Sequence, residues 1–171
     1  AFGGNHTSSD FAGGESSGGI SSGGIYSFDV GSNRTLGVQP TGSDMTPGSI
    51  GLQLTNSTGT SVDQWTISYD LWVNNNEQRG NSVQLSYSLD DSSYVSLSEL
   101  DYVSPVASDT AGWTINSLET TFDITVANGS NLFFKWTIAD DSGSGSRDEF
   151  GFDGIVVSTE TSGGAGGGSV G

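Results

Sequence analysis

Polar side chains, most of them acidic, are concentrated between positions 140 and 153. The set consists of Asp140, Asp141, Ser142, Asp148, Glu149 and Asp153. Calcium takes six to eight oxygen ligands from carboxylates, carbonyls and water, and a loop that joins two strands can wrap such an ion. We therefore predict a calcium site whose ligands are Asp140, Asp141, Asp148, Glu149 and Asp153.

Asp153 differs from the other acids because it lies within an apolar segment, Phe150-Gly-Phe-Asp-Gly-Ile155. A carboxylate in such a strand is partly buried and needs a partner. The sequence leaves three partners open: an ion, Arg147 or Lys135. Simple exposure of Asp153 to solvent is a further alternative.

A second polar set follows Trp72 and suits a carbohydrate. Sugars are bound by aromatic rings that lie beside amide, carboxylate or guanidinium groups, and the candidate residues are Trp72, Asn74, Asn75, Asn76, Arg79 and Trp113. Trp72 occupies the polar phase of its strand, so its ring is a candidate platform. The alternative is that Trp72 packs between the sheets or under the N-terminal segment.

Catalytic groups are scarce. The chain has no cysteine and one histidine, His6, which excludes thiol chemistry and leaves a Ser-His-Asp triad or a histidine-rich zinc site without support. Acids are plentiful enough for a glycosidase pair, but no pair stands out by position. We predict that the chain is not an enzyme.

The charge balance restricts the partners. Four basic residues (Arg34, Arg79, Lys135 and Arg147) stand against 20 acidic ones, for a formal net charge of -16. Nucleic acid and anionic membranes attract clustered Lys and Arg, so neither is expected as a partner. No apolar run is long enough to span a bilayer. An acidic chain without cysteine suits screened, calcium-rich surroundings outside the cell, at a surface or in a matrix.

Short alternating strands must position these residues. Apolar and polar residues alternate from Trp65 to Val73, from Val83 to Leu89, from Phe122 to Val126 and from Leu132 to Ile138. The 27 glycines favour tight turns over helices. We predict an all-β, antiparallel, jelly-roll-like sandwich of roughly nine short strands. A Gly/Ser-rich extended arm (1–24) is expected to pack on the sandwich (25–158), and a Gly-rich tail or linker (159–171) follows.

Three segments carry a family resemblance: residues 11–28, 65–72 and 140–157. Together they resemble the β-sandwich modules of large bacterial exported proteins that carry C-terminal sorting or anchoring signals of the PEP-CTERM or type IX secretion kind. The resemblance implies a sandwich fold and a secreted protein. The segment around Asp153 also resembles the closing strand of calcium-dependent jelly rolls, in which the matching acid binds a structural ion.

The chain departs from this family at its start, where other members have about one more strand before the position of Phe2. Either the sequence is a fragment, or a neighbouring subunit supplies the strand by β-strand addition. We therefore expect a non-catalytic structural or adhesive module, stabilised by calcium and self-assembling by strand exchange into a surface layer or filament. The alternative function is a carbohydrate-binding module.

Overall fold

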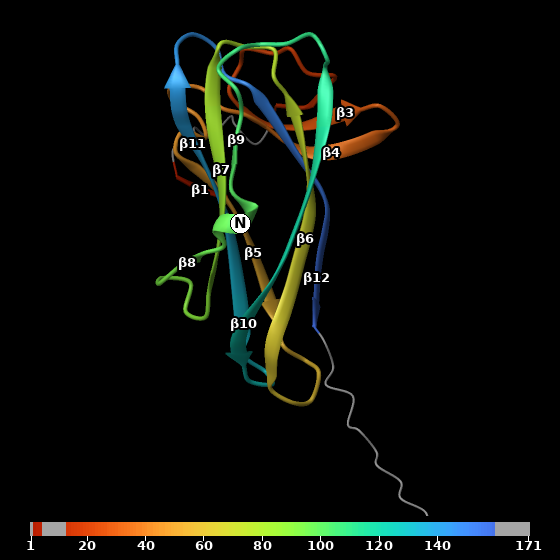
Figure 1. Ribbon diagram of the computed structural model, residues 1–171, viewed down its shortest axis with the longest axis vertical. Coiled ribbons are helices and arrows are strands. Elements are labelled where there is room, and N and C mark those ends of the chain that lie inside the picture. The colour runs from red at the N-terminus through yellow and green to blue at the C-terminus, as the bar shows by residue number, and fades with distance from the viewer. Residues whose placement is uncertain (1, 5–12, 160–171) are drawn as a thin grey trace, which may run out of the picture.

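The computed structural model describes residues 2–4 and 13–159, which form two six-stranded sheets that face each other (Figure 1). Sheet A contains, in spatial order, β1 (Phe2–Gly4), β5 (Gly48–Thr55), β11 (Asn131–Gly143), β7 (Arg79–Ser88) and β8 (Val95–Ser96), with β9 (Tyr102–Val103) also on β7. Sheet B contains β10 (Trp113–Val126), β6 (Val62–Asn74), β12 (Glu149–Thr159), β4 (Asn33–Gln39), β3 (Gly24–Val30) and β2 (Glu15–Ser16). A 3-10 turn, η2, covers Ser98–Leu100. The predicted all-β sandwich is confirmed.

The core fills the space between the sheets, and strand alternation builds it. The odd-numbered residues from Trp65 to Val73 on β6 are buried, as predicted, while the even-numbered ones face outward. Sheet A contributes the even-numbered residues from Leu132 to Ile138 of β11 to the same core. Among these, the Trp136 ring lies 5.6 Å from the Tyr69 ring and 6.2 Å from the Phe152 ring. The inner faces therefore interlock around an aromatic centre.

Two details differ from the expectation. Strand β10 begins at Trp113 rather than near Phe122, and with 14 residues it is the longest strand described. The sandwich is also not wholly antiparallel, because β2 pairs with β3 in parallel. None of the described residues forms a helix long and apolar enough to cross a membrane.

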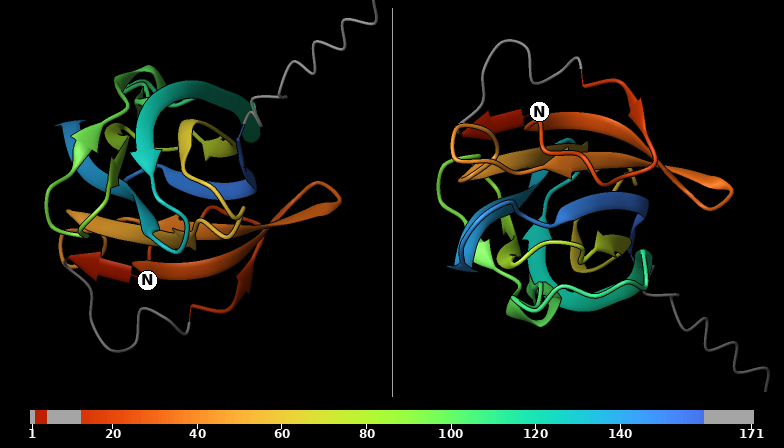
Figure 2. Two further views of the ribbon diagram at one scale, coloured as in Figure 1. Left: turned by 90° about the horizontal axis from the view of Figure 1, so that it is seen from below. Right: turned by 90° about the horizontal axis from the view of Figure 1, so that it is seen from above.

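The described part of the N-terminal arm touches both sheets. β1 pairs with β5 at one edge of sheet A, and β2 pairs with β3 at one edge of sheet B. The β3–β4 hairpin projects beyond the sandwich (Figure 2), and Arg34 at its turn makes an ion pair with Glu15 of the arm. His6 and residues 160–171, nearly all of the predicted tail, lie outside the described residues.

Candidate functional site

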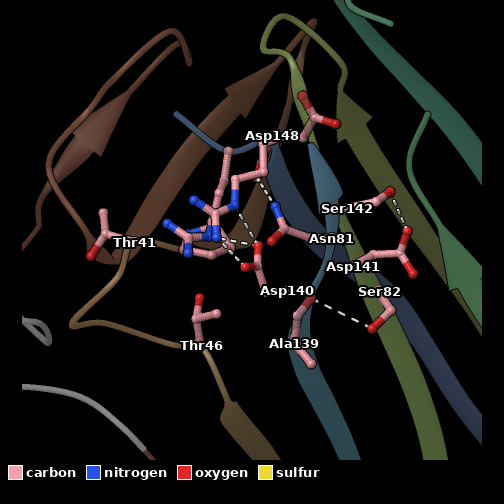
Figure 3. A network of polar contacts seen from close by, with 12 residues as sticks. Thr41, Thr46, Asn81, Ser82, Ala139, Asp140, Asp141, Ser142 and Asp148 are labelled. Atoms are coloured by element: carbon pink, nitrogen blue, oxygen red, sulfur yellow. Dashed lines mark hydrogen bonds and ion pairs between the residues drawn. The ribbon is translucent and has the colours of Figure 1, made fainter. Parts of the chain in front are cut away.

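The first predicted calcium ligand, Asp140, is bound to two arginines. Its Oδ1 accepts hydrogen bonds from Arg79 Nε at 2.7 Å and from Arg147 Nε at 3.1 Å, and its Oδ2 pairs with Arg79 Nη2. The Arg79 hydrogen bond, followed by Arg147, lowers the pKa of Asp140. Asp141 points to the other side of β11 and bonds Ser142 (Figure 3). These two neighbouring acids therefore do not share an ion.

Asp148 is fully buried just before β12. Its Oδ1 accepts the Glu77 N–H at 3.1 Å, whereas its Oδ2 has no hydrogen-bond partner among the described residues. Burial raises the pKa of this carboxyl, hydrogen bonds from the Ser104 side chain and the Glu77 N–H oppose the shift, and the nearby acids Glu77 and Asp109 add to it. Asp148 is thus a buried acid that makes no ion pair with any described residue.

The last two predicted ligands point to other partners. Glu149 accepts two backbone N–H groups of the arm and the side-chain amide of Asn74. Asp153 accepts bonds from Asn33 and from the Gly154 N–H. No three acidic or histidine side chains of the described residues lie where they could hold one metal ion. The five acids therefore do not fit a common calcium site, and calcium binding stays a prediction.

Of the predicted sugar-binding residues, Trp72, Asn74 and Trp113 lie on the outer face of sheet B, Asn75 and Asn76 follow β6 in a loop, and Arg79 begins β7 of sheet A. Trp72 faces outward and is partly exposed, beside the half-exposed Ile115 of β10. The amides that follow have internal partners: Asn74 Nδ2 bonds Glu149 at 2.7 Å, and Asn75 Nδ2 bonds Ala107 O and Asp109 Oδ2, each at 3.0 Å. Asn76 Oδ1 is buried without a partner among the described residues.

The other two members of that set are also engaged. Arg79 pairs with Asp140, and Trp113 Nε1 donates to the Ser17 carbonyl at 2.8 Å. The Trp113 ring also lies 5.0 Å from the Phe28 ring. The set is therefore divided between sheet B, the β6–β7 loop and the start of β7 in sheet A, the arm lies against Asn74 and Trp113 through Glu149 and Ser17, and most of the polar groups bond to the protein.

The outer faces of the two sheets differ in charge. On sheet B, outward positions carry the carboxylates of Asp70, Glu119, Asp123, Glu149 and Asp153. On sheet A, neither β5 nor β7 contains an acid, and β11 has none between Asn131 and Ala139. In a protein with 20 acids, three central strand segments without an outward-facing acid mark a different kind of face, and the carboxylates of Asp91 and Asp101 reach it only from neighbouring loops, through Tyr94 and Gln84.

The register of sheet A arranges this face in three rows. They are Ser49–Thr137–Gln84, Gly51–Lys135–Ser86 and Gln53–Phe133–Ser88. Gln53 and Gln84 are exposed, and Phe133, Lys135 and Thr137 are partly exposed. We call the surface formed by Ser49, Gln53, Gln84, Ser86, Tyr94, Phe133, Lys135 and Thr137 the Lys135 face.

Lys135, the one lysine in the sequence, lies at the centre of the face. Its Nζ is 3.5 Å from the centre of the Tyr94 ring, a cation–π contact, and it makes no ion pair with any described residue. The Tyr94 hydroxyl donates to Asp91. Partial burial, then the Asp91 carboxylate, raise the pKa of Tyr94 to about 12, so the ring stays neutral and positioned over the ammonium group.

The face offers hydrogen-bond donors and acceptors of several kinds beside two aromatic rings. Glutamine amides donate and accept, serine and threonine hydroxyls do both, and the lysine donates. Spacing along the chain does not indicate this face, and from the sequence Lys135 is a candidate only as a partner for Asp153. The available signal was the long acid-free stretch of β11, which becomes a face only when the strand pairing is known.

Comparison with known proteins gives a likeness in fold. A scan against models of protein families finds no match, and a search of curated proteins finds none. Among solved structures, the chain is similar to a carbohydrate-binding module, CBM28, described as specific for non-crystalline cellulose. The identity is 10%, the TM-score 0.50, and the match covers 84% of this chain and 86% of that one. A CBM4 module matches at 13% identity and a TM-score of 0.38, over 82% of this chain and 91% of that one. The first match shows a shared jelly-roll sandwich.

Proposed function

We propose that the chain is a non-catalytic carbohydrate-binding module that acts outside the cell and holds a glycan on the Lys135 face. The observation that carries the proposal is the outer surface of β5, β7 and residues 131–139 of β11, strand segments without an acid, with Lys135 beneath Tyr94 at its centre. A sugar presents hydroxyl groups at its rim and C–H groups on its faces. The amides and hydroxyls match the rim, and the rings of Tyr94 and Phe133 match the faces.

The outer face of sheet B is the competing surface for the same ligand. It has Trp72 and Ile115, but the amides and guanidinium predicted to assist Trp72 are bonded within the protein. A ligand there would have to break those bonds, whereas on sheet A Gln53 is exposed and Gln84 makes only one long, exposed hydrogen bond, from its Nε2 to Asp101 Oδ2 at 3.5 Å. The geometry therefore favours sheet A.

Binding to soluble polysaccharides tests the proposal by affinity electrophoresis, followed by calorimetry with the oligosaccharides of any polymer that retards the protein. Amorphous cellulose and cellohexaose are the first probes, because the CBM28 module of similar fold takes non-crystalline cellulose. We expect Tyr94→Ala to weaken binding about tenfold, which corresponds to about 1.4 kcal/mol for a lost ring contact. Tyr94→Phe keeps the ring and should keep most of the affinity.

Trp72→Ala is the matched aromatic variant on the other sheet. Unchanged binding in Trp72→Ala together with weakened binding in Tyr94→Ala would support the Lys135 face. The reverse pattern would move the site to sheet B. A panel on which nothing binds would refute the function itself.

A further inference from the structure

A cavity of about 730 Å³ lies at the end of the sandwich where β6 begins and β10 ends, at the bottom of Figure 1. Residues 62–64 of β6, residues 123–125 of β10 and the loop that precedes β6 form it, and Thr159 at the end of β12 borders it. Its volume is within the range of about 300–1,000 Å³ that is typical of small-molecule sites. We call this cavity the Asp63 pocket.

A β-bulge shapes the Asp63 pocket. Three steps along β10, from Asp123 to Val126, lie opposite two steps along β6, from Gln64 to Val62. The extra residue disturbs the regular pairing of the strands and changes the direction in which neighbouring side chains point. The bulge therefore brings side chains from both strands to one hollow at the end of sheet B.

Two carboxylates line the pocket, and each is held by a neutral donor. Gln64 Nε2 donates to Asp123 Oδ1 at 2.9 Å, and Thr125 Oγ1 donates to Asp63 Oδ1 at 2.8 Å. The second oxygen of each carboxylate accepts no hydrogen bond from a described residue, and neither acid makes an ion pair among them. No lysine, arginine or histidine is among the lining residues that the structure describes. Each carboxylate thus has one oxygen fixed by the protein and one oriented for a ligand.

The loop that forms one wall of the pocket is held in place by Asn56, whose side chain is 2% exposed. Its Nδ2 donates to the carbonyls of Thr60 at 2.9 Å and of Val126 at 2.8 Å, and its Oδ1 accepts from the Thr58 N–H at 3.1 Å. These bonds tie the loop to the end of β10. A ligand therefore meets a wall that is already formed, and less conformational entropy is lost on binding.

The remaining lining suits a ring that carries hydroxyl groups. Hydroxyl side chains both donate and accept hydrogen bonds, and four of them line the pocket: Thr58, Thr60, Ser61 and Thr125. Val62 and Ile124 add apolar contacts for C–H groups. A simple ammonium ion would occupy only a small part of this volume. The lining therefore favours a saccharide, and the two carboxylates favour one with a positive charge.

We propose that the Asp63 pocket binds a short chain of amino sugars, whose ammonium groups bind the free oxygens of Asp63 and Asp123. Such hydrogen bonds between charged groups are stronger than neutral ones, and the formal net charge of -16 attracts a cationic ligand. This site is separate from the Lys135 face, which lies on the other sheet and has a lysine at its centre. An ammonium group is repelled there, so the two surfaces would select different sugars.

Calorimetry with a glucosamine tetramer tests the proposal, in mildly acidic buffer in which the sugar amines are protonated. The N-acetylglucosamine tetramer has the same rings and linkage without the charge. We expect it to bind at least about tenfold more weakly, which is the effect of losing one hydrogen bond between charged groups. Tyr94→Ala, which alters the Lys135 face, should bind the glucosamine tetramer as the wild type does.

Asp63→Asn and Asp123→Asn should each weaken binding of the glucosamine tetramer at least about tenfold. Glu119→Gln is the matched control, because Glu119 is an exposed acid of β10 that does not line the pocket. It changes the net charge by the same amount and should bind as the wild type does. Thermal melts of the three variants establish that each is folded, since all three substitutions are at exposed positions.

Four results would each overturn the proposal. They are a glucosamine tetramer that does not bind, an N-acetylated tetramer that binds as tightly, full affinity in both aspartate variants, and an equal loss of affinity in Glu119→Gln. The last result would mean that the net charge of the protein attracts the ligand without a site. Loss of cellulose binding alone would instead refute the Lys135 face, because the two sites have no residue in common.

Discussion

Replacing Asp148 with asparagine should stabilise the protein at neutral pH. The carboxyl is fully buried, its Oδ2 has no partner among the described residues, and its pKa is raised chiefly by burial. A group whose folded pKa lies above its unfolded value favours folding in its protonated form. Its contribution is complete below the unfolded pKa, about 3.9 for aspartate, and is lost as the pH rises through the folded value.

The size of the effect follows from the unpaired group. A buried polar group left without a partner costs about 1–3 kcal/mol, and 1 kcal/mol shifts the melting temperature of a domain of this length by about 2–4 °C. Asparagine keeps the Oδ1 that accepts the Glu77 N–H at 3.1 Å. Its new amide group has an acceptor available in Asn81 Oδ1, which also lacks a partner among the described residues. We expect Asp148→Asn to raise the melting temperature by about 2–12 °C at pH 7.

The assay is a series of thermal melts from pH 3 to pH 8 in EDTA, with Asp141→Asn as the control, because Asp141 is exposed on β11. The advantage of Asp148→Asn should disappear near pH 4 and grow as the pH rises. A variant that is less stable than the wild type at pH 7 in EDTA would refute this reasoning. If the loss of stability appeared only in calcium, Asp148 would instead be a ligand of that ion.

Three further outcomes are expected. If calcium stabilises the native state, EDTA should lower the wild-type melting temperature by several degrees by mass action, and identical melts with and without EDTA would count against the ion. Trp136→Ala should lower the free energy of unfolding, measured in urea, by about 3–5 kcal/mol, because this ring is 1% exposed and lies between Tyr69 and Phe152. A decrease below about 1 kcal/mol would mean that the core closes around the cavity that the ring leaves. Lys135→Met should change stability by less than about 0.5 kcal/mol, as a surface substitution does, while weakening glycan binding in the electrophoresis assay, and equal retardation of both proteins would remove Lys135 from the site.

Strand alternation predicted much of the fold. The runs from Trp65 to Val73 and from Leu132 to Ile138 are inward-facing strands, as their period indicates. Strand β10 was missed in its first half for a physical reason. Trp113 and Ile115 face outward, whereas Leu118 and Phe122 pack on the core, so the apolar residues change phase within one strand and their alternation is lost.

The site was harder to predict because it depends on register. Grouping acids by sequence spacing placed Asp140, Asp148 and Asp153 together, but the first lies on β11 of sheet A, the second precedes β12 and the third lies on β12 of sheet B, so each has a different partner. Conversely, Gln53, Gln84 and Lys135 are far apart in sequence and become neighbours only through the pairing of β5 and β7 with β11. The charges on the two outer faces can be assigned only after the pairing of the strands is known.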